Sequence, residues 1–261
     1  MINQLQPGLV RRVKVIGFDG SDVLVSLGNA EGEGSEIGRI PWHEASMRRV
    51  DHPSEIFEVG QEIDAEEIGR WGEGQLHVSA RACEDPALRS FVLGIERGQV
   101  VTGTVSEVHN FGVFVHLDGE PEGSCTGFIR VPDLTWSRIS HAAEVVQAGQ
   151  RVRAEVINAE TRSGQVAISL KALQEDPLVQ FADQVGQVLQ GPITKVIPFG
   201  VFVQLAAGVE GFLHLSELTD EPVETPDEIV GEGEVITVKV AEVDLQRHRV
   251  RLCAAAEGSD R

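Results

Sequence analysis

The chain has 261 residues, of which 41% are hydrophobic and 5% aromatic, with 28 glycines and no tyrosine. This composition favours several small, glycine-rich β units over one large helical core, and the net charge of −19 argues against a basic surface that binds nucleic acid indiscriminately. No apolar run suits a membrane span or a signal peptide, and the three cysteines form no CxxC pair, so we expect a cytoplasmic protein without disulfides.

Two sequence markers show that the chain is built from repeats. The segment ACEDPALRSF returns as ALQEDPLVQF, and HNFGVFVHL returns as IPFGVFVQL at nearly the same spacing. Such self-similarity indicates tandem copies of one small unit. In the Glu-Asp-Pro markers, Asp85 and Asp176 are expected to cap short helices that begin at the following proline. The repeats are 1–85, 86–176 and 177–256, followed by a polar tail, 257–261, that is expected to be frayed.

The first repeat is the most divergent of the three. VRRVKVIGFDGSDVLVSLG predicts two alternating strands around a turn. When these strands are aligned with those of the later repeats, Ser21 and Leu24 stand where the others have phenylalanines. Pro41 stands where the third repeat has a histidine. Trp71 lies in a glycine-rich turn and is interpreted either as a ligand contact or, as we expect, as a ring that packs over the rim of the unit. The first repeat therefore lacks an aromatic platform.

The second repeat carries the aromatic motif in HNFGVFVHL, where Phe111 and Phe114 flank Gly112. Alternation of apolar residues predicts that the valines between and after the phenylalanines face the core. A later loop contains Trp136 and Arg138, which are interpreted either as additional contacts or as part of a hydrophobic lid.

The third repeat gives the clearest prediction of an exposed aromatic face. If Val201 and Val203 point inward along a strand, Phe202 must point outward, because successive side chains alternate between faces. Phe199 has the parity of the buried valines, but a bulge at Gly200 would turn it outward. The same alternation places His214 and Arg249 on the outer face. The alternative is that both phenylalanines are ordinary core residues of a small barrel.

Aromatic rings, an imidazole and an arginine on one face suit a particular ligand. Unpaired nucleobases stack on aromatic rings and arginine planes, and cations contact phosphates. The combination of FGVF, a following histidine, and a late aspartate and arginine resembles the S1 RNA-binding domain, the module named after the largest protein of the bacterial small ribosomal subunit. The resemblance implies an all-β fold of three tandem five-stranded OB-fold barrels with short helical linkers.

The same resemblance implies which residues contact RNA. It assigns Arg130 to the histidine position of the second repeat and Glu160 to its acidic position, and it implies that the first repeat serves for docking rather than for RNA. The RNA-binding residues implied by the resemblance are Phe199, Phe202, His214, Asp244 and Arg249 in the third repeat, and Phe111, Phe114, Arg130 and Glu160 in the second.

The sequence contains no motif that indicates catalysis. Walker loops, HExxH, GxSxG and a GxGxxG that opens a helix are all absent from the sequence. The histidines are scattered and do not pair with cysteines at the spacing of metal ligands. We therefore expect no enzyme, no cofactor and no metal site.

The resemblance implies a partner and leaves other functions open. It implies a cytoplasmic protein that binds single-stranded RNA, mRNA in particular, and associates with the ribosome or basic ribosomal proteins rather than with a membrane. Three repeats are fewer than the ribosomal protein of most bacteria carries, which favours a paralogue. The alternatives are an acidic protein-interaction scaffold, which the negative charge favours, or an accessory factor of transcription or RNA decay.

Overall fold

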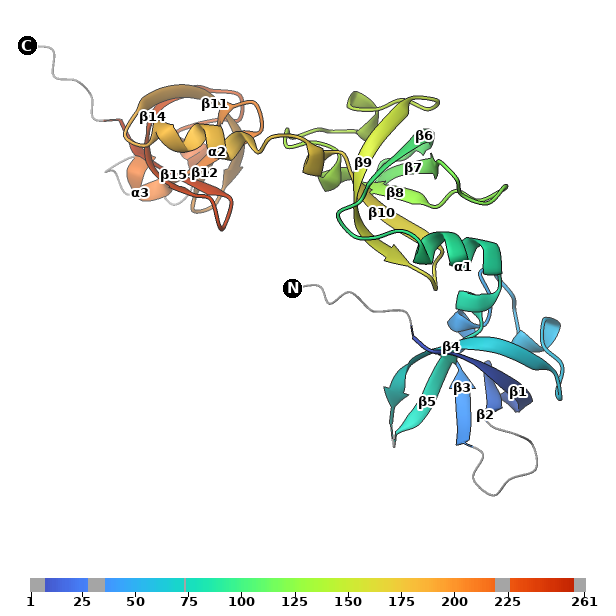
Figure 1. Ribbon diagram of the computed structural model, residues 1–261. Helices are drawn as coiled ribbons and strands as arrows, with labels where there is room; N and C mark the ends of the chain where they lie inside the picture. The colour runs from blue at the N-terminus through green and yellow to red at the C-terminus, as the bar shows by residue number, and fades with distance from the viewer. Residues whose placement is uncertain (1–7, 28–35, 73, 219–225, 256–261) are drawn as a thin grey trace, which may run out of the picture. The chain divides into compact units, whose positions relative to one another are not determined.

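The computed structural model describes residues 8–27, 36–72, 74–218 and 226–255, so the predicted frayed tail lies outside the described residues. It contains three closed barrels of five strands each, which confirms the predicted all-β architecture (Figure 1). Two compact regions make up the chain. The first comprises Met1–Val131 and Val145–Leu170 and contains two barrels, and the second comprises Pro132–Glu144 and Lys171–Arg261 and contains the third barrel.

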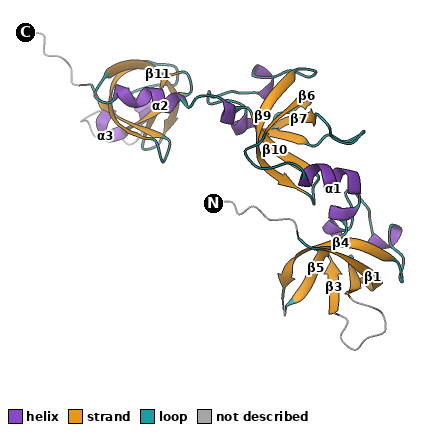
Figure 2. Ribbon diagram, viewed as in Figure 1, coloured by secondary structure: helices purple, strands orange, loops and turns teal. Residues whose placement is uncertain are grey.

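Each barrel has the same strand order around its circumference, namely first, second, third, fifth and fourth. Figure 2 shows the strands of the barrels in orange and the short helices in purple. The first barrel consists of β1 (Val10–Asp19), β2 (Asp22–Leu27), β3 (Glu36–Ile40), β4 (Glu62–Trp71) and β5 (Gln75–Ser79). The second consists of β6 (Val100–Val108), β7 (Gly112–Leu117), β8 (Gly127–Arg130), β9 (Arg151–Glu160) and β10 (Gln165–Ser169). The third consists of β11 (Val188–Ile197), β12 (Gly200–Ala206), β13 (Val209–His214), β14 (Val235–Asp244) and β15 (Arg249–Ala254).

Closure of each barrel depends on one parallel pair and on an irregularity in the first strand. The third and fifth strands pair in parallel, and the other neighbours pair antiparallel. The register of the first strand shifts by one residue, between Val15 and Gly17 in the first barrel and between Ile193 and Lys195 in the third. A bulge of this kind bends and twists a strand, as a small closed barrel requires.

The core of each barrel is built from the inward residues of alternating strands. In the third barrel, Val201, Val203 and Leu213 are at most 3% exposed. Small branched side chains suit this site because a five-stranded barrel has a narrow interior. Phe181, from the helix that precedes the barrel, packs against the same core.

Short helices connect the barrels, and their N-termini are capped as predicted. In α1 (Pro86–Leu93) the Asp85 carboxylate accepts the backbone N–H groups of Ala87 and Leu88, and in α2 (Pro177–Phe181) Asp176 accepts that of Leu178. A third helix, α3 (Leu215–Leu218), follows β13 directly. The remaining helical segments are single 3₁₀ turns: η1 (Trp42–Glu44), η2 (Pro53–Glu55), η3 (Arg81–Cys83), η4 (Val131–Asp133), η5 (Ala142–Glu144), η6 (Lys171–Leu173), η7 (Ala182–Gln184) and η8 (Pro226–Glu228).

A buried charge in the first compact region joins elements from two repeats. Glu66 of β4 is 3% exposed and forms an ion pair with Arg89 of α1. The hydroxyl of Thr161, in the turn after β9, donates to the same carboxylate at 3.1 Å, and the backbone N–H of Gly8 donates to it at 2.9 Å. A buried carboxylate needs such partners, because an unpaired charge in the interior is costly.

Candidate nucleic-acid interface

The third barrel carries three phenylalanine rings that contact one another on its outer side. Phe202 of β12 lies opposite Phe212 of β13 in the strand register, with ring centroids 5.3 Å apart. Phe199 lies 5.9 Å from Phe212, so Phe212 is the central ring. Phe199 is 57% exposed, and Phe202 and Phe212 are half-buried. An exposed cluster of this kind offers flat apolar faces to a ligand.

Gly200 allows this cluster to form because it has no side chain. A Cβ at this position would lie 2.3 Å from the carbonyl oxygen of Leu213 and 2.6 Å from the ring of Phe212. Any larger residue would therefore push Phe212 out of its place. In the second barrel, Gly112 has the same relation to Phe128, at 2.6 Å.

The predicted reason for the exposure of Phe199 is wrong. No bulge forms at Gly200, which pairs regularly with His214. Instead, Phe199 lies in the turn between β11 and β12, where the alternation of a strand does not apply. The turn itself carries the ring out to solvent.

His214 ends β13 beside the cluster, with its ring centroid 6.4 Å from that of Phe212. The side chain is exposed, and its Nδ1 accepts the backbone N–H of Ser216 at 3.2 Å. Nδ1 also lies 2.8 Å from the hydroxyl oxygen of Ser216. The imidazole is therefore held at the start of α3 through one nitrogen.

Asp244 and Arg249 lie opposite each other where β14 and β15 meet the turn that joins them. Asp244 accepts the backbone N–H groups of Gln246 and Arg247 at 3.0 and 2.9 Å, so the carboxylate shapes this turn. Among the described residues, the structure records no ion pair or hydrogen bond for the Arg249 side chain. Its guanidinium is therefore available to a ligand.

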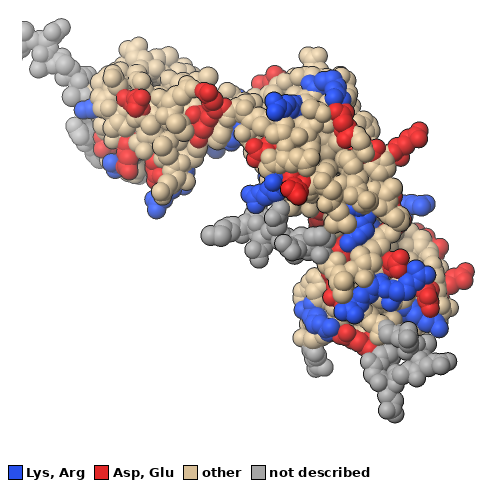
Figure 3. Space-filling view, in the orientation of Figure 1, with Lys and Arg blue, Asp and Glu red and all other residues tan. Residues whose placement is uncertain are grey.

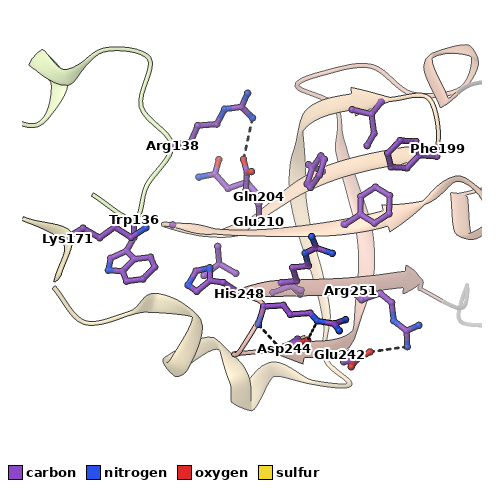
Figure 4. A pocket seen from close by; sticks show the side chains of 18 residues that line it. Trp136, Arg138, Lys171, Phe199, Gln204, Glu210, Glu242, Asp244, His248 and Arg251 are labelled. Atoms are coloured by element: carbon purple, nitrogen blue, oxygen red, sulfur yellow. Dashed lines mark hydrogen bonds and ion pairs between the residues drawn. The ribbon is translucent and has the colours of Figure 1, made fainter. Parts of the chain in front are cut away.

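The three phenylalanines, Asp244 and Arg249 line a groove of about 760 Å³ that is more positive than the rest of the chain (Figure 4), whereas His214 is not among the described residues that line it. Five arginine and lysine side chains line it against three carboxylates. Each carboxylate lies near an arginine: Glu210 lies 3.6 Å from Arg138, and Glu242 lies 3.4 Å from Arg251. Figure 3 shows acidic and basic side chains interspersed over the described surface in view. The groove is therefore a local exception in an acidic protein.

The second barrel has a similar ring cluster, with one further member. Phe114 of β7 faces Phe128 of β8, with centroids 5.1 Å apart, and Phe111 is 57% exposed. The imidazole of His109 stacks on Phe111 at 5.1 Å with planes 12° apart. Arg130 ends β8 opposite Gly112, in the place that His214 has in the third barrel, and its side chain is exposed.

Glu160, the remaining predicted residue of the second barrel, is engaged by its neighbours. Its carboxylate accepts from Arg162 at 3.0 Å and from the Ser163 hydroxyl at 3.1 Å. It lies opposite Gln165 in the strand register, as Asp244 lies opposite Arg249 in the third barrel. Among the described residues, Glu160 lines a groove of about 550 Å³ whose lining does not include the phenylalanines of this barrel. The structure therefore does not bring Glu160 and the rings into one groove.

Three aromatic residues of these clusters were missed by sequence reasoning. They are His109, Phe128 and Phe212. A signal for two of them was present: Phe212 has the same strand parity as His214, and Phe128 has the same parity as Arg130. Both follow a glycine that lies inside the barrel. His109 lies before the turn that carries Phe111, and its side-chain direction could not be read from alternation.

In the first barrel, the predicted absence of a phenylalanine pair is observed at the aligned positions. Leu24 lies opposite Arg39, as Phe202 lies opposite Phe212. Trp71 is 51% exposed, and its indole lies over Gly69 and meets the edge of His77 at 4.6 Å. The ring therefore packs on its own barrel.

The described part of the chain contains neither a metal-binding cluster nor a membrane-spanning helix. No group of three or more histidine, cysteine or acidic side chains is placed to hold a metal ion among those residues. Within the same residues, no helix has both the length and the apolar character needed to span a membrane.

Comparisons with known proteins agree with this geometry. The sequence model of the S1 RNA binding domain matches residues 95–171 and 182–255, which contain the second and third barrels. Small ribosomal subunit protein bS1 of Mycobacterium tuberculosis is 36% identical over 231 residues, which cover 85% of this chain and 46% of that protein. The bS1 homolog of Bacillus subtilis is 31% identical over 160 residues, which cover 60% of this chain and 41% of that protein.

Among solved structures, the intact alpha subunit of aIF2 from Pyrococcus abyssi is 28% identical, covering 34% of this chain and 35% of that chain, with a TM-score of 0.29. The chain spans less than half the length of the bS1 proteins that it matches. The two segments matched by the domain model together exceed half of the chain, and each includes a complete five-stranded barrel with an exposed ring cluster. The chain belongs to the S1 RNA-binding domain family.

Proposed function

We propose that this protein binds single-stranded RNA through the outer ring clusters of its third and second barrels. The observation that carries the proposal is the cluster of Phe199, Phe202 and Phe212, which is open to solvent beside Arg249, a residue with no recorded partner in the described part of the chain. Exposed aromatic faces are unfavourable in water unless a ligand covers them. Each base that stacks on such a ring contributes about 1–3 kcal/mol.

The proposed contacts divide into stacking and polar roles. The rings receive bases, and Arg249 and Arg130 contact phosphates or stack on bases. The free nitrogen of His214 is placed to meet a base edge or a sugar hydroxyl. Asp244 and Glu160 act mainly by holding the turns that present these groups. The proposed RNA-binding residues are Phe199, Phe202, His214, Asp244 and Arg249, together with Phe111, Phe114, Arg130 and Glu160.

The charge of the protein shapes this binding. With a net charge of −19, the protein repels polyanions at long range, so affinity has to come from stacking and from a few cations inside the groove. Few phosphate contacts mean a shallow dependence of affinity on salt. The proposal therefore predicts selectivity for unpaired RNA over duplexes, whose bases are not available for stacking.

The relatives suggest where this binding is used. They are named as proteins of the small ribosomal subunit, and we infer a role on mRNA in translation, in the cytoplasm, by binding alone and without catalysis. Residues 1–85 are proposed as a docking domain for the ribosome or a basic ribosomal protein, since their barrel lacks the phenylalanine cluster.

The acidic surface supports a second candidate, a scaffold that binds basic proteins without RNA. A partner that co-purifies after nuclease treatment, together with no affinity of the purified protein for RNA, would favour this scaffold over the RNA-binding proposal.

The proposed function is tested by the triple variant Phe199→Ala, Phe202→Ala, His214→Ala of the full chain. Binding of a fluorescent unstructured RNA is measured by anisotropy at several salt concentrations. The proposal predicts at least a tenfold loss of affinity, because at least one stacked base is lost. Unchanged thermal unfolding of the variant is the control, and wild-type affinity in the variant would refute the site.

A further inference from the structure

The groove of the third barrel is completed by a loop from outside the barrel strands. Residues 132–144 precede β9 in the sequence, yet they belong to the same compact region as β11–β15. Trp136 and Arg138 from this loop, and Lys171, line the groove together with the ring cluster. Figure 4 shows Phe199 at one end of the groove and Trp136 with Lys171 at the other. The aromatic lining therefore extends beyond the ring cluster.

Several contacts fix Trp136 in this place. Its indole stacks on the imidazole of His248, with centroids 4.9 Å apart and planes at 15°. At Gly208, in the turn between β12 and β13, a Cβ would lie 3.1 Å from the Cβ of Trp136, so the glycine permits the loop to approach. Arg138 reinforces the attachment by pairing with Glu210 at 3.6 Å.

The indole N–H of Trp136 makes no hydrogen bond within the described residues, although the atom is buried. The ring is therefore held by stacking and packing rather than by a polar contact. A buried donor without a partner costs about 1–3 kcal/mol. This unfavourable contribution to stability falls on Trp136, a residue that lines the groove.

Lys171 is the group that Trp136 presents to the groove. Its ammonium lies 3.8 Å from the centroid of the indole, which is the geometry of a cation–π contact. Among the described residues, no carboxylate is recorded as its partner. Gln174, just after η6, donates to the carbonyl oxygen of Leu134 at 3.3 Å, which ties the backbone near Lys171 to the same loop. The Lys171 ammonium is therefore held in a defined position, and no described carboxylate neutralises its charge.

A positioned, unneutralised ammonium beside a groove that is lined with aromatic rings fits a phosphate of a single strand. A single strand has one phosphate for each base. When some of its bases stack on the ring cluster, the phosphates of the neighbouring nucleotides lie along the groove. We propose that Lys171, positioned by Trp136, binds an RNA phosphate at the far end of this groove and lengthens the binding site of the third barrel. This inference rests on the proposed function of the ring cluster. Trp136 acts as a positioning residue, and Lys171 makes the contact.

The test uses the full chain with Phe111→Ala and Phe114→Ala, so that binding reports on the third barrel. In this background, oligouridines of increasing length are titrated at several salt concentrations. Affinity is expected to rise with length until the strand reaches Lys171. With Lys171→Gln, the shortest strand binds as before, and long strands bind about fivefold more weakly at 0.1 M salt, because one phosphate contact is lost. The slope of log affinity against log salt falls by about 0.7 on long strands only.

Two further variants separate positioning from folding. Trp136→Ala is expected to reproduce the loss on long strands and the smaller salt slope, whereas Trp136→Phe keeps both because it keeps an aromatic face under the ammonium. Lys239→Gln is the matched control, since it removes the same charge from an exposed position of the same barrel that does not line the groove in the described structure. Lys239→Gln is expected to leave the increase of RNA affinity with oligouridine length unchanged.

The outcomes distinguish this inference from the proposed function. If the background chain binds long oligouridines and Lys171→Gln changes neither the gain with length nor the salt slope, the inference is overturned while the ring cluster stands. If the wild-type chain binds no single-stranded RNA of any length, the proposed function fails and the inference fails with it.

Discussion

The first and third barrels have the same strand order, and Leu24 pairs with Arg39 as Phe202 pairs with Phe212, but their outer faces carry opposite chemistry. In the third barrel, Gly200 makes room for Phe212. In the first barrel, Asp22 occupies the position of Gly200, and Arg39 occupies that of Phe212. Arg39 pairs with Asp22 at 2.9 Å and with Asp19 at 2.6 Å. One face presents rings, and the other neutralises its own charges.

This difference shows that the inner and outer residues of such a barrel are set independently. The inward valines keep both barrels closed, since Val23 and Val25 are as completely buried as Val201 and Val203. The outward residues differ, with phenylalanine rings in the third barrel and an arginine paired with aspartates in the first. The glycine between the two phenylalanines belongs to the outer set, because its missing Cβ leaves the space that the Phe212 ring occupies.

The largest expected effect concerns a position that the two barrels use differently. Glu66 is buried and paired with Arg89, whereas Lys239, at the equivalent place in the third barrel, is exposed. Glu66→Ala is expected to lower the free energy of unfolding by about 3–5 kcal/mol, because it leaves the Arg89 charge buried without its partner. Lys239→Ala is expected to change it by less than about 0.5 kcal/mol. Urea denaturation of the full chain measures both, and equal effects would contradict the comparison.

The second prediction gives the third barrel the outer residues of the first. Phe202→Leu combined with Phe212→Arg is expected to weaken the binding of single-stranded RNA by more than about tenfold, since two ring surfaces are lost and the new guanidinium restores only part of the stacking. The matched change in the first barrel, Leu24→Ala with Arg39→Ala, is expected to leave affinity nearly unchanged. Fluorescence anisotropy with one unstructured RNA compares the two variants. A larger loss of RNA affinity in the first-barrel variant would place the RNA-binding face on the first barrel instead of the third.

A single substitution tests the role of the glycine. Gly200→Asp introduces the residue of the first barrel, and its Cβ would clash with the Leu213 carbonyl and with the Phe212 ring. We expect RNA affinity to fall about tenfold, from the loss of one stacking surface, and stability to fall by about 1–3 kcal/mol. Gly231→Ala is the control, because a Cβ there meets nothing within 4 Å. Full affinity of the Asp variant would show that the ring does not depend on the glycine.

The smallest expected effect concerns the pKa of His77 in the first barrel. Burial and, next, the nearby charge of Arg39 lower the pKa of His77 in the first barrel. The folded chain therefore binds this proton less readily than the unfolded chain, so the contribution of His77 to stability falls as pH drops through about 6.5. NMR titration should find the pKa of His77 below the ordinary value, and Arg39→Ala should raise it. If the pKa of His77 is unchanged in that variant, the charge of Arg39 does not act on His77.

The sequence was sufficient to predict the barrels because their signals are local. Alternating valines, the Glu-Asp-Pro markers and the Asp85 and Asp176 caps all act within a few residues. Parity along the strand also predicted that Phe202 would point outward. The exposure of Phe199 was predicted for a wrong reason, because the boundary between strand and turn depends on hairpin pairing, which single residues do not fix.

Features that join distant segments could not be predicted in the same way. Glu66 sits in an alternating strand and reads as a solvent-facing acid, but α1 and the turn at Thr161 cover it. Trp136 was assigned to the second repeat by its place in the chain, yet it lines the groove of the third barrel. Such contacts depend on how loops pack in three dimensions, about which the periodicity of either segment carries no information.

Crosslinking tests the central claim most directly, since it records where RNA lies without any substitution. Single-stranded RNA that contains 4-thiouridine is irradiated with the wild-type chain, and the attached peptides are identified by mass spectrometry. The account predicts crosslinks in β12 and β13, at or beside Phe199, Phe202 and Phe212, and none in the matching strands β2 and β3 of the first barrel. Crosslinks concentrated in β2 and β3, with none in β12 and β13, would contradict it.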